Sequence, residues 1–249
     1  MNILAIDTCN EILSLAVLRE NENTLKPLIE LTLSATENMF SSQLKVGNKQ
    51  SEYILPEIDN LLHKAKLNIH DINLIAYNQG PGSFTGLRIG LSAALGLAYS
   101  INCKLVPIPA FALYVNQFTR HYPNVIVTLD ARLGQLYIAG LRSQDFSFFI
   151  EPQLINPEEL AAIISSNQEL DANNTIFTGE GYKIYSSKID QQITMSYTHI
   201  SQEYPSALNM LYLASSEVYQ RVSVVNAELL YLRNKVAMDL TEQKLYKKS

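Results

Sequence analysis

The stretch Gly80-Pro81-Gly82-Ser83-Phe84-Thr85-Gly86-Leu87-Arg88-Ile89-Gly90 decides how this sequence folds. The apolar run that precedes it, residues 72–77, is typical of a buried strand. The alanine- and leucine-rich segment that follows it to about residue 100 is typical of a helix. The sequence therefore predicts a strand, a glycine turn and a helix, with three of the ten glycines inside seven residues.

Two roles for these glycines stay open. A glycine turn before a helix can cradle a phosphate, because glycine permits close backbone approach and a helix N-terminus offers unpaired N–H groups. Yet the Lys-Ser/Thr pair of a P-loop does not follow Gly86, and Thr85 stands where the dinucleotide motif needs its third glycine. The other role is packing, since Gly86, Gly90, Ala94 and Ala98 recur every four residues and form a smooth stripe. The spacing favours packing.

Composition limits the classes of function. The chain has 249 residues, enough for one large domain or two small ones, and a net charge of −5. That charge argues against a protein that grips nucleic acid through a broad basic face of its own. Cys9 and Cys103 form no disulfide framework. With no basic leader and no apolar run near the length of a membrane span, a soluble cytoplasmic protein is expected.

Periodicity predicts a mixed α/β chain. Strands are expected at residues 2–6, 12–18, 27–33, 104–108, 124–129, 135–141, 146–150, 175–178 and 229–232. Helices are expected at residues 51–67, 110–120 and 157–166, and a long one from residue 204, with a loop at 44–50. Pro56 is expected in the first turn of its helix, where its missing N–H costs nothing.

The stretch from Gly80 to Gly90 resembles the signature of the TsaB (YeaZ) family, and the resemblance covers nearly the whole chain. Residues 1–18 resemble the family's opening strand pair, Asp130-Ala131-Arg132 with Tyr137 its central element, and Tyr231-Leu232-Arg233 its C-terminal one. The resemblance implies an actin-like (ASKHA, ribonuclease H-like) α/β fold of two related subdomains with mixed sheets flanked by helices. Residues 1–106 and 107–233 are the expected subdomains, and residues 234–249 a polar tail.

The resemblance also implies a function. The family's members pair with the paralogous subunit TsaD and support transfer of threonylcarbamoyl to the adenosine beside the anticodon of certain tRNAs. TsaC makes the adenylate, TsaE is an ATPase acting on the assembled pair, and tRNA is met only through the complex. Two histidines bind a metal in TsaD, and the corresponding positions here are close to Ala110 and Tyr114, so neither a metal nor another cofactor is expected. Gln50 stands where the family usually has a histidine.

The alternative is an actin-like small-molecule kinase or ATPase. In those enzymes two Asp-x-Gly turns hold Mg²⁺ and phosphates. Asp7 and Asp130 stand after the two strands in question, but Thr8-Cys9 and Ala131-Arg132 take the place of the glycines. Gly179-Glu180-Gly181 resembles the adenosine-binding glycine pair only weakly. A non-catalytic partner subunit is therefore favoured over this alternative.

The partner surface is expected on the helices at residues 51–67 and 84–100, which flank one strand. They would form half of a helical bundle completed by the partner or by a second copy of this chain. A competing interpretation buries these faces inside the chain. The predicted interface residues are Ile54, Ile58, Leu61, Leu62, Gly86, Gly90, Ala94 and Ala98.

Overall fold

The computed structural model describes residues 1–20, 38–115, 121–201 and 204–233. These residues form two five-stranded mixed sheets, with strand orders β3-β2-β1-β4-β5 and β10-β9-β6-β7-β8. Each sheet has an antiparallel meander of three strands continued by two parallel strands. When the second order is written in reverse, as β8-β7-β6-β9-β10, it matches the first strand by strand, with β6 in the place of β1. The chain therefore repeats one topology in two lobes, as expected of an actin-like fold.

The strands and helices have the following bounds. The first sheet contains β1 (Ile3–Asp7), β2 (Ile12–Leu18), β3 (Met39–Lys45), β4 (Leu74–Gly80) and β5 (Lys104–Pro109). The second contains β6 (Asn124–Asp130), β7 (Leu136–Arg142), β8 (Phe148–Ile155), β9 (Thr175–Thr178) and β10 (Thr198–Ile200). The α-helices are α2 (Gln50–Lys64), α3 (Phe84–Ile101), α4 (Leu160–Ser165), α5 (Gly181–Ile184), α6 (Gln191–Ser196) and α7 (Leu208–Ser215). The 3₁₀ turns are η1 (Ile69–Asp71), η2 (Ala110–Tyr114), η3 (Pro157–Glu159) and η4 (Val224–Asn226).

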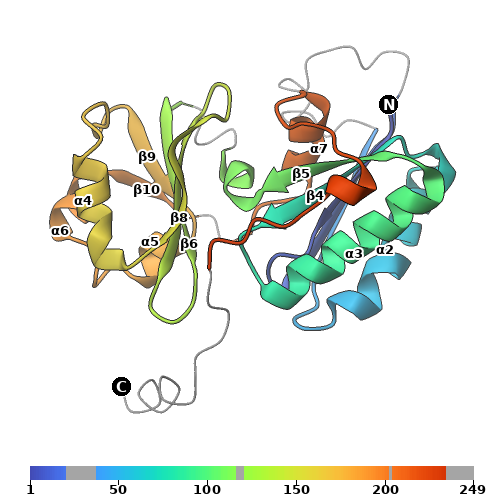
Figure 1. The fold of residues 1–249 in the computed structure, drawn as a ribbon, viewed down its shortest axis with the longest axis horizontal. Helices are drawn as coiled ribbons and strands as arrows, with labels where there is room; N and C mark the ends of the chain where they lie inside the picture. The colour runs from blue at the N-terminus through green and yellow to red at the C-terminus, as the bar shows by residue number, and fades with distance from the viewer. Residues whose placement is uncertain (21–37, 116–120, 202–203, 234–249) are drawn as a thin grey trace.

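The two sheets and their helices form layers (Figure 1). Helices α2 and α3 cover the outer face of the first sheet and share a core with it, and α4 to α6 do the same on the second sheet. A third core lies between the sheets and combines residues of β1, β5, β6 and β7 with those of η2 and α7. The two lobes are thus joined by continuous apolar packing, which fixes the position of the loops of one lobe relative to those of the other.

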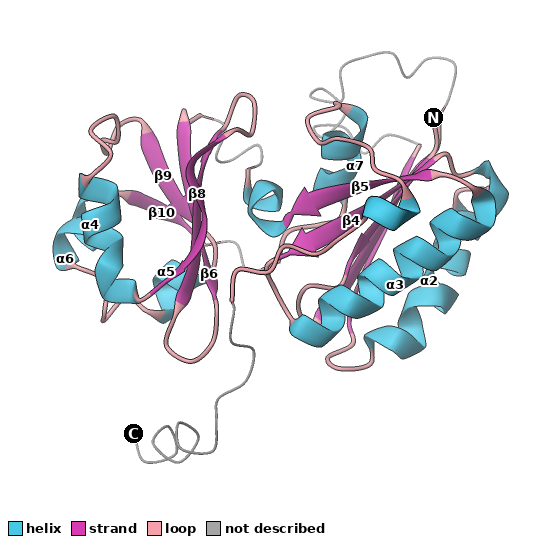
Figure 2. Cartoon of the chain, in the orientation of Figure 1, coloured by secondary structure: helices cyan, strands magenta, loops and turns pink. Residues whose placement is uncertain are grey.

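The end of the described chain returns to the first lobe. Helix α7 contacts β1, β2, β4 and β5, although it follows β10 in the sequence. Residues 222–233, here called the strap, then run along the first lobe; they begin with the 3₁₀ turn η4 and continue as an extended segment (Figure 2). The predicted boundary between residues 106 and 107 falls inside β5, and the strap and α7 belong by packing to the first sheet.

Most predicted elements match, and the differences have local causes. The third strand of the meander is β3, which the sequence analysis missed because its serines give no apolar alternation; the strand predicted at 27–33 lies outside the described residues. Pro56 lies in the second turn of α2, not the first. Helix α7 is shorter than expected, and η2 replaces the start of the helix predicted at 110–120. The strand predicted at 229–232 is wrong, since the strap's Leu230 makes a single ladder-like bond, to the Gln79 carbonyl.

Helix α3 corrects one further expectation. Among the described residues it is a helix long and apolar enough to cross a membrane, as judged by length and composition alone. It connects β4 to β5, which are parallel neighbours in one sheet. Such a connection must cross back over the sheet face, and α3 does so. Its position is explained by that crossover.

Candidate functional site

The glycine turn before α3 packs against the turn between β1 and β2. The Ser83 N–H donates to the Cys9 carbonyl at 2.6 Å, and a Cβ added at Gly82 would lie 2.7 Å from that same oxygen. The Ser83 hydroxyl in turn caps the helix by accepting from the Gly86 N–H at 3.2 Å. The Cys9 carbonyl and the Ser83 hydroxyl therefore accept from two of the N–H groups that this turn and helix start could offer to an anion.

The glycine stripe of α3 continues this packing. A Cβ at Gly86 would overlap the carbonyl oxygen of Thr8, and one at Gly90 would overlap the Thr8 hydroxyl. That hydroxyl donates to the Gly86 carbonyl at 2.8 Å and is buried. The absence of side chains lets the end of β1 press onto α3, which is the packing role that the spacing favoured.

The second lobe repeats this arrangement. Cβ atoms at Gly179 and Gly181 would overlap backbone atoms of Thr128 and Leu129, near the end of β6. The Thr128 hydroxyl accepts from the Tyr182 N–H at 2.9 Å, at the start of α5. The Gly-x-Gly pair that weakly suggested an adenosine site thus also makes a close contact within its own lobe.

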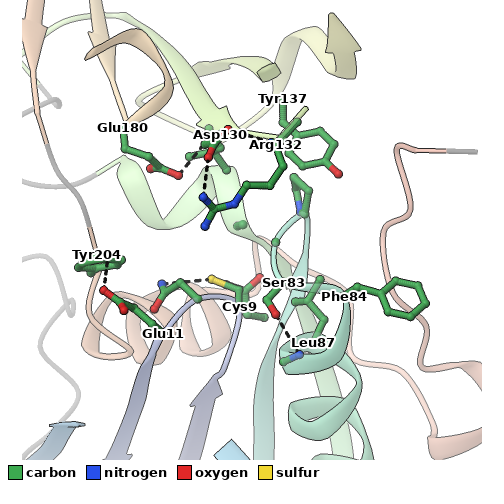
Figure 3. Close-up of a pocket in the computed structure, with 18 of the residues that line it drawn as sticks. Cys9, Glu11, Ser83, Phe84, Leu87, Asp130, Arg132, Tyr137, Glu180 and Tyr204 are labelled. Carbon is green, nitrogen blue, oxygen red and sulfur yellow. Dashed lines mark hydrogen bonds and ion pairs between the residues drawn. The ribbon is translucent and has the colours of Figure 1, made fainter. Parts of the chain in front are cut away.

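A cleft of ≈ 1610 Å³ separates the loops of the two lobes (Figure 3). Cys9, Glu11, Ser83 and Phe84 line it from the first lobe. Asp130, Arg132, Tyr137 and Glu180 line it from the second. The kinase alternative would place its nucleotide in this cleft. Whether the carboxylates there could bind Mg²⁺ and phosphates depends on their burial and on their hydrogen-bond partners.

Asp7 is buried at the end of β1, with 1% of its surface exposed. Its Oδ1 accepts from the Cys9 N–H at 2.9 Å and from the Asn78 amide at 3.0 Å. Burial raises the pKa of Asp7, against the opposing effect of these hydrogen bonds. Burial, followed by the charge of Asp7, also raises the pKa of the Cys9 thiol well above its ordinary value. A thiol in this state is a poor nucleophile.

Asp130 and Glu180 are held by groups of the chain. Asp130 accepts from the Tyr185 hydroxyl at 2.8 Å and pairs with the Arg132 guanidinium at 3.2 Å. The Glu180 carboxylate accepts from the Tyr114 hydroxyl at 3.0 Å and from the Asp130 N–H at 3.3 Å, and burial raises its pKa. The ion pair between Asp130 and Arg132 joins two residues of the family's central element. Within the described residues, no group of three His, Cys, Asp or Glu side chains could hold a metal ion.

The positions aligned with the metal-binding histidines of TsaD lie in η2. Ala110 and Tyr114 are both buried and both line the cleft. Tyr114 uses its hydroxyl to reach Glu180 of the other lobe. Gln50, at the position where the family usually has histidine, starts α2 and donates to the Asn10 carbonyl at 2.6 Å. Tyr114 and Gln50 therefore contribute to contacts between segments of the fold.

The eight predicted interface residues face the interior of the first lobe. Ile54, Ile58, Leu61 and Leu62 pack against the sheet from α2, and Ala94 and Ala98 do so from α3. Gly86 and Gly90 contact Thr8, as described above. The competing interpretation describes their packing, so the surface that these two helices offer to a partner consists of other side chains.

Part of the outer surface of α2 and α3 is nevertheless apolar. Tyr99 is 80% exposed, Leu55 54% and Phe84 46%. A groove of ≈ 480 Å³ runs between the helices, lined mainly by Leu55, Phe84, Ile89 and Ala93, together with Arg88. A contiguous apolar patch rimmed by polar groups is typical of an interaction surface. This α2–α3 groove is the candidate docking site.

Comparisons with known proteins agree with the fold. The family model of TsaD, tRNA N6-adenosine threonylcarbamoyltransferase, matches residues 36–241. The tRNA threonylcarbamoyladenosine biosynthesis protein TsaB of Haemophilus influenzae is 30% identical over 95% of this chain and 95% of its own length. This chain belongs to the TsaB (YeaZ) family.

Two further relatives support the membership. The TsaB of Escherichia coli is 27% identical over 95% of this chain and 96% of its own length. The structure of YeaZ from Pseudomonas aeruginosa has a TM-score of 0.73 at 22% identity and covers 93% of this chain and 99% of that one. The family's fold therefore extends over both lobes of this TsaB-family chain.

The sequence analysis missed two contacts that the fold creates. One joins Tyr114 to Glu180 across the lobes. The other brings Tyr231 of the strap to Arg88 of α3, with the guanidinium carbon 5.1 Å from the ring centroid. Both pairs are far apart in sequence, and no local pattern could have paired them. The family signatures that contain Arg88 and Tyr231 were the available hint.

Proposed function

We propose that this chain is the non-catalytic partner subunit of the tRNA threonylcarbamoyladenosine (t6A) synthesis complex. In this proposal it binds the paralogous TsaD and supports its transfer of threonylcarbamoyl to the adenosine next to the anticodon. The similarity to TsaB of Haemophilus influenzae over 95% of both chains supports the assignment to this process. The match of a TsaD family model supports a paralogous partner of the same fold.

The exposed apolar face of α2 and α3 carries the binding part of the proposal. Large side chains there (Tyr99, Leu55 and Phe84) have no core to enter, because the inner faces of both helices already fill it. Covering them with a partner's helices would remove this surface from water, at a gain of about 25 cal/mol per Å². A second copy of this chain could use the same surface when TsaD is absent.

The non-catalytic role is supported by the cleft. The Cys9 carbonyl receives the Ser83 N–H, and Asp130 and Glu180 accept from tyrosine hydroxyls of the chain. These groups would have to be released before they could hold a nucleotide and Mg²⁺, which disfavours the kinase alternative. In the proposal TsaD supplies the metal and the chemistry, TsaE acts on the assembled pair, tRNA is met only through the complex, and the process takes place in the cytoplasm.

Reconstitution tests this proposal. TsaC, TsaD and TsaE of the same organism would be incubated with tRNA and the substrates of the adenylate, with and without this chain, and t6A would be measured in digested tRNA. We expect t6A only when TsaD and this chain are both present. Formation of t6A with this chain but without TsaD would show that it is itself the transferase, and undiminished formation without it would exclude the supporting role.

A further inference from the structure

Arg88 stands out on the surface of α3, where it is the one charged residue of the helix. Its guanidinium carbon lies 3.4 Å from the ring centroid of Phe84, one turn earlier, and 5.1 Å from that of Tyr231. One of its nitrogens, Nη1, donates to the Phe84 carbonyl at 3.0 Å. The guanidinium is thus held in place by two aromatic rings and one hydrogen bond.

The strap brings Tyr231 to this place. The Leu230 N–H donates to the Gln79 carbonyl at 2.8 Å, and the Tyr77 hydroxyl donates to the Glu228 carbonyl at 2.8 Å. These bonds fix the strap beside the glycine turn, and Tyr231 is still 52% exposed. The two family signatures, at residues 80–90 and 231–233, are far apart in the sequence and meet at Arg88.

A second arginine of the chain shows what Arg88 lacks. Arg142, on β7, also lies against an aromatic ring, with its guanidinium carbon 4.7 Å from the Phe149 centroid. Arg142 pairs with the Glu169 carboxylate at 2.6 Å. None of the ion pairs found among the described residues involves Arg88. An arginine fork is suited to bidentate binding of a carboxylate, and no carboxylate of the described residues pairs with this one.

We propose that the protein that docks in the α2–α3 groove presents a carboxylate to Arg88. The inference rests on the proposed function and specifies the partner surface: apolar side chains for Leu55, Ile89 and Ala93, and an Asp or Glu at the end formed by Phe84, Arg88 and Tyr231. Docking would shield the pair from water, which strengthens it, and the rings hold the guanidinium before binding. Arginine and tyrosine are among the residue types most enriched at the few positions that dominate the binding energy of protein interfaces.

Charge favours a protein carboxylate over an anionic membrane or a nucleic acid. Helix α2, which forms the other wall of the groove, carries Glu52, Glu57 and Asp59, against one lysine, Lys64, in its last turn. Extended anionic surfaces would meet these carboxylates as well as the single arginine, and the chain as a whole has a net charge of −5. A single carboxylate placed at the Arg88 end of the groove avoids them.

Calorimetric titration of purified TsaD from the same organism tests the proposal, with full-length wild-type chain and its variants. Arg88→Gln should weaken binding at least about 30-fold, the range expected when one partner of a desolvated charge pair is removed. Arg142→Gln is the matched control, since it removes an aromatic-stacked arginine from the other lobe, and should bind as wild type does. Leu55→Asp should abolish binding through the apolar part of the groove.

Carbodiimide cross-linking supplies a readout that does not depend on stability. Arg88→Lys places an amine at this site, and a water-soluble carbodiimide should join it by an amide bond to an Asp or Glu of TsaD, identified by mass spectrometry. If Arg88→Gln lowers the melting temperature, this cross-link alone decides. Absence of the cross-link in a complex that forms would overturn the proposal.

The outcomes separate this proposal from the proposed function. If Leu55→Asp abolishes binding while Arg88→Gln binds within about twofold of wild type, the carboxylate proposal is wrong and the docking surface stands. If the wild-type chain does not bind TsaD, both fail. Co-sedimentation of the wild-type chain, but not Arg88→Gln, with anionic phospholipid vesicles would assign Arg88 to a membrane and also overturn the proposal.

Discussion

Replacement of Gly86 by alanine tests whether the glycine stripe of α3 serves close packing. An added Cβ would overlap the Thr8 carbonyl oxygen on one side, and would lie 3.2 Å from Oγ and 3.3 Å from Cβ of Ser83 on the other. The new methyl group has no space to move into, so the end of β1 and the start of α3 must separate. Overpacking of this kind typically costs about 1–3 kcal/mol, and the neighbour here is backbone, which favours the upper half of that range.

Gly96→Ala in the same helix is the matched control. A Cβ there meets nothing within 4 Å, and the residue is exposed, so the substitution should stabilise α3 by up to about 1 kcal/mol through helix propensity alone. For a chain of this size, each kcal/mol moves the melting temperature by about 2–4 °C. Differential scanning calorimetry should therefore show Gly86→Ala melting several degrees below wild type and Gly96→Ala slightly above it. If both variants are stabilised to the same extent, the packing account of the glycine turn is wrong.

Three further predictions follow from the cleft. Because burial raises the pKa of Asp7, the folded chain binds that proton more tightly than the unfolded chain, and stability should fall as pH rises from about 4 through the folded-state pKa. Between pH 4 and 7 the midpoint of urea unfolding of Asp7→Asn should increase relative to that of wild type as pH rises. If the two midpoints change with pH in parallel, the pKa of Asp7 is not raised. Tyr114→Phe should cost about 1–3 kcal/mol, because Glu180 loses a buried donor, whereas Tyr99→Phe at an exposed site should cost nothing measurable in the same thermal assay. Untagged protein should contain well under one equivalent of iron or zinc, and calorimetric titration with ATP and Mg²⁺ should give weak or no binding. A stoichiometric metal that survives dialysis would favour an enzyme. A sub-micromolar affinity for ATP that is lost in Asp7→Ala would do the same.

The sequence allowed the positions of most strands in both lobes to be predicted, because buried strands read as apolar runs, although it did not predict the short β10. It failed at β3, where Ser41 and Ser42 interrupt any apolar pattern and pairing with β2 decides the structure. It also failed at the strap, whose apolar Leu229–Leu232 segment resembles a strand but lies along α3 and the glycine turn. Local pattern alone does not say whether an extended segment finds a ladder partner.

The candidate site was only partly predictable, for a reason that lies in α3 itself. Apart from Arg88 the helix is uncharged around its whole circumference, so periodicity could not say which face is buried. In the structure the two faces differ in the size of their side chains. The small residues Gly86, Gly90 and Ala94 face the sheet, where the β1–β2 turn comes close, and the large residues Phe84 and Tyr99 face outward. That these two helices form the partner surface stays a prediction; the residues named for it face the sheet, and the exposed apolar side chains lie on the opposite faces.

Binding of TsaD to surface variants tests the central claim most directly. Leu55→Asp places a charge in the α2–α3 groove, and Met195→Asp places one at an exposed apolar site in the second lobe, where Met195 is 85% exposed. Both variants should stay folded, since substitutions at exposed sites usually change stability by no more than about 0.5 kcal/mol. In sedimentation velocity with TsaD of the same organism, we predict a complex with wild type and with Met195→Asp, and none with Leu55→Asp. A complex of unchanged affinity with Leu55→Asp would contradict the account.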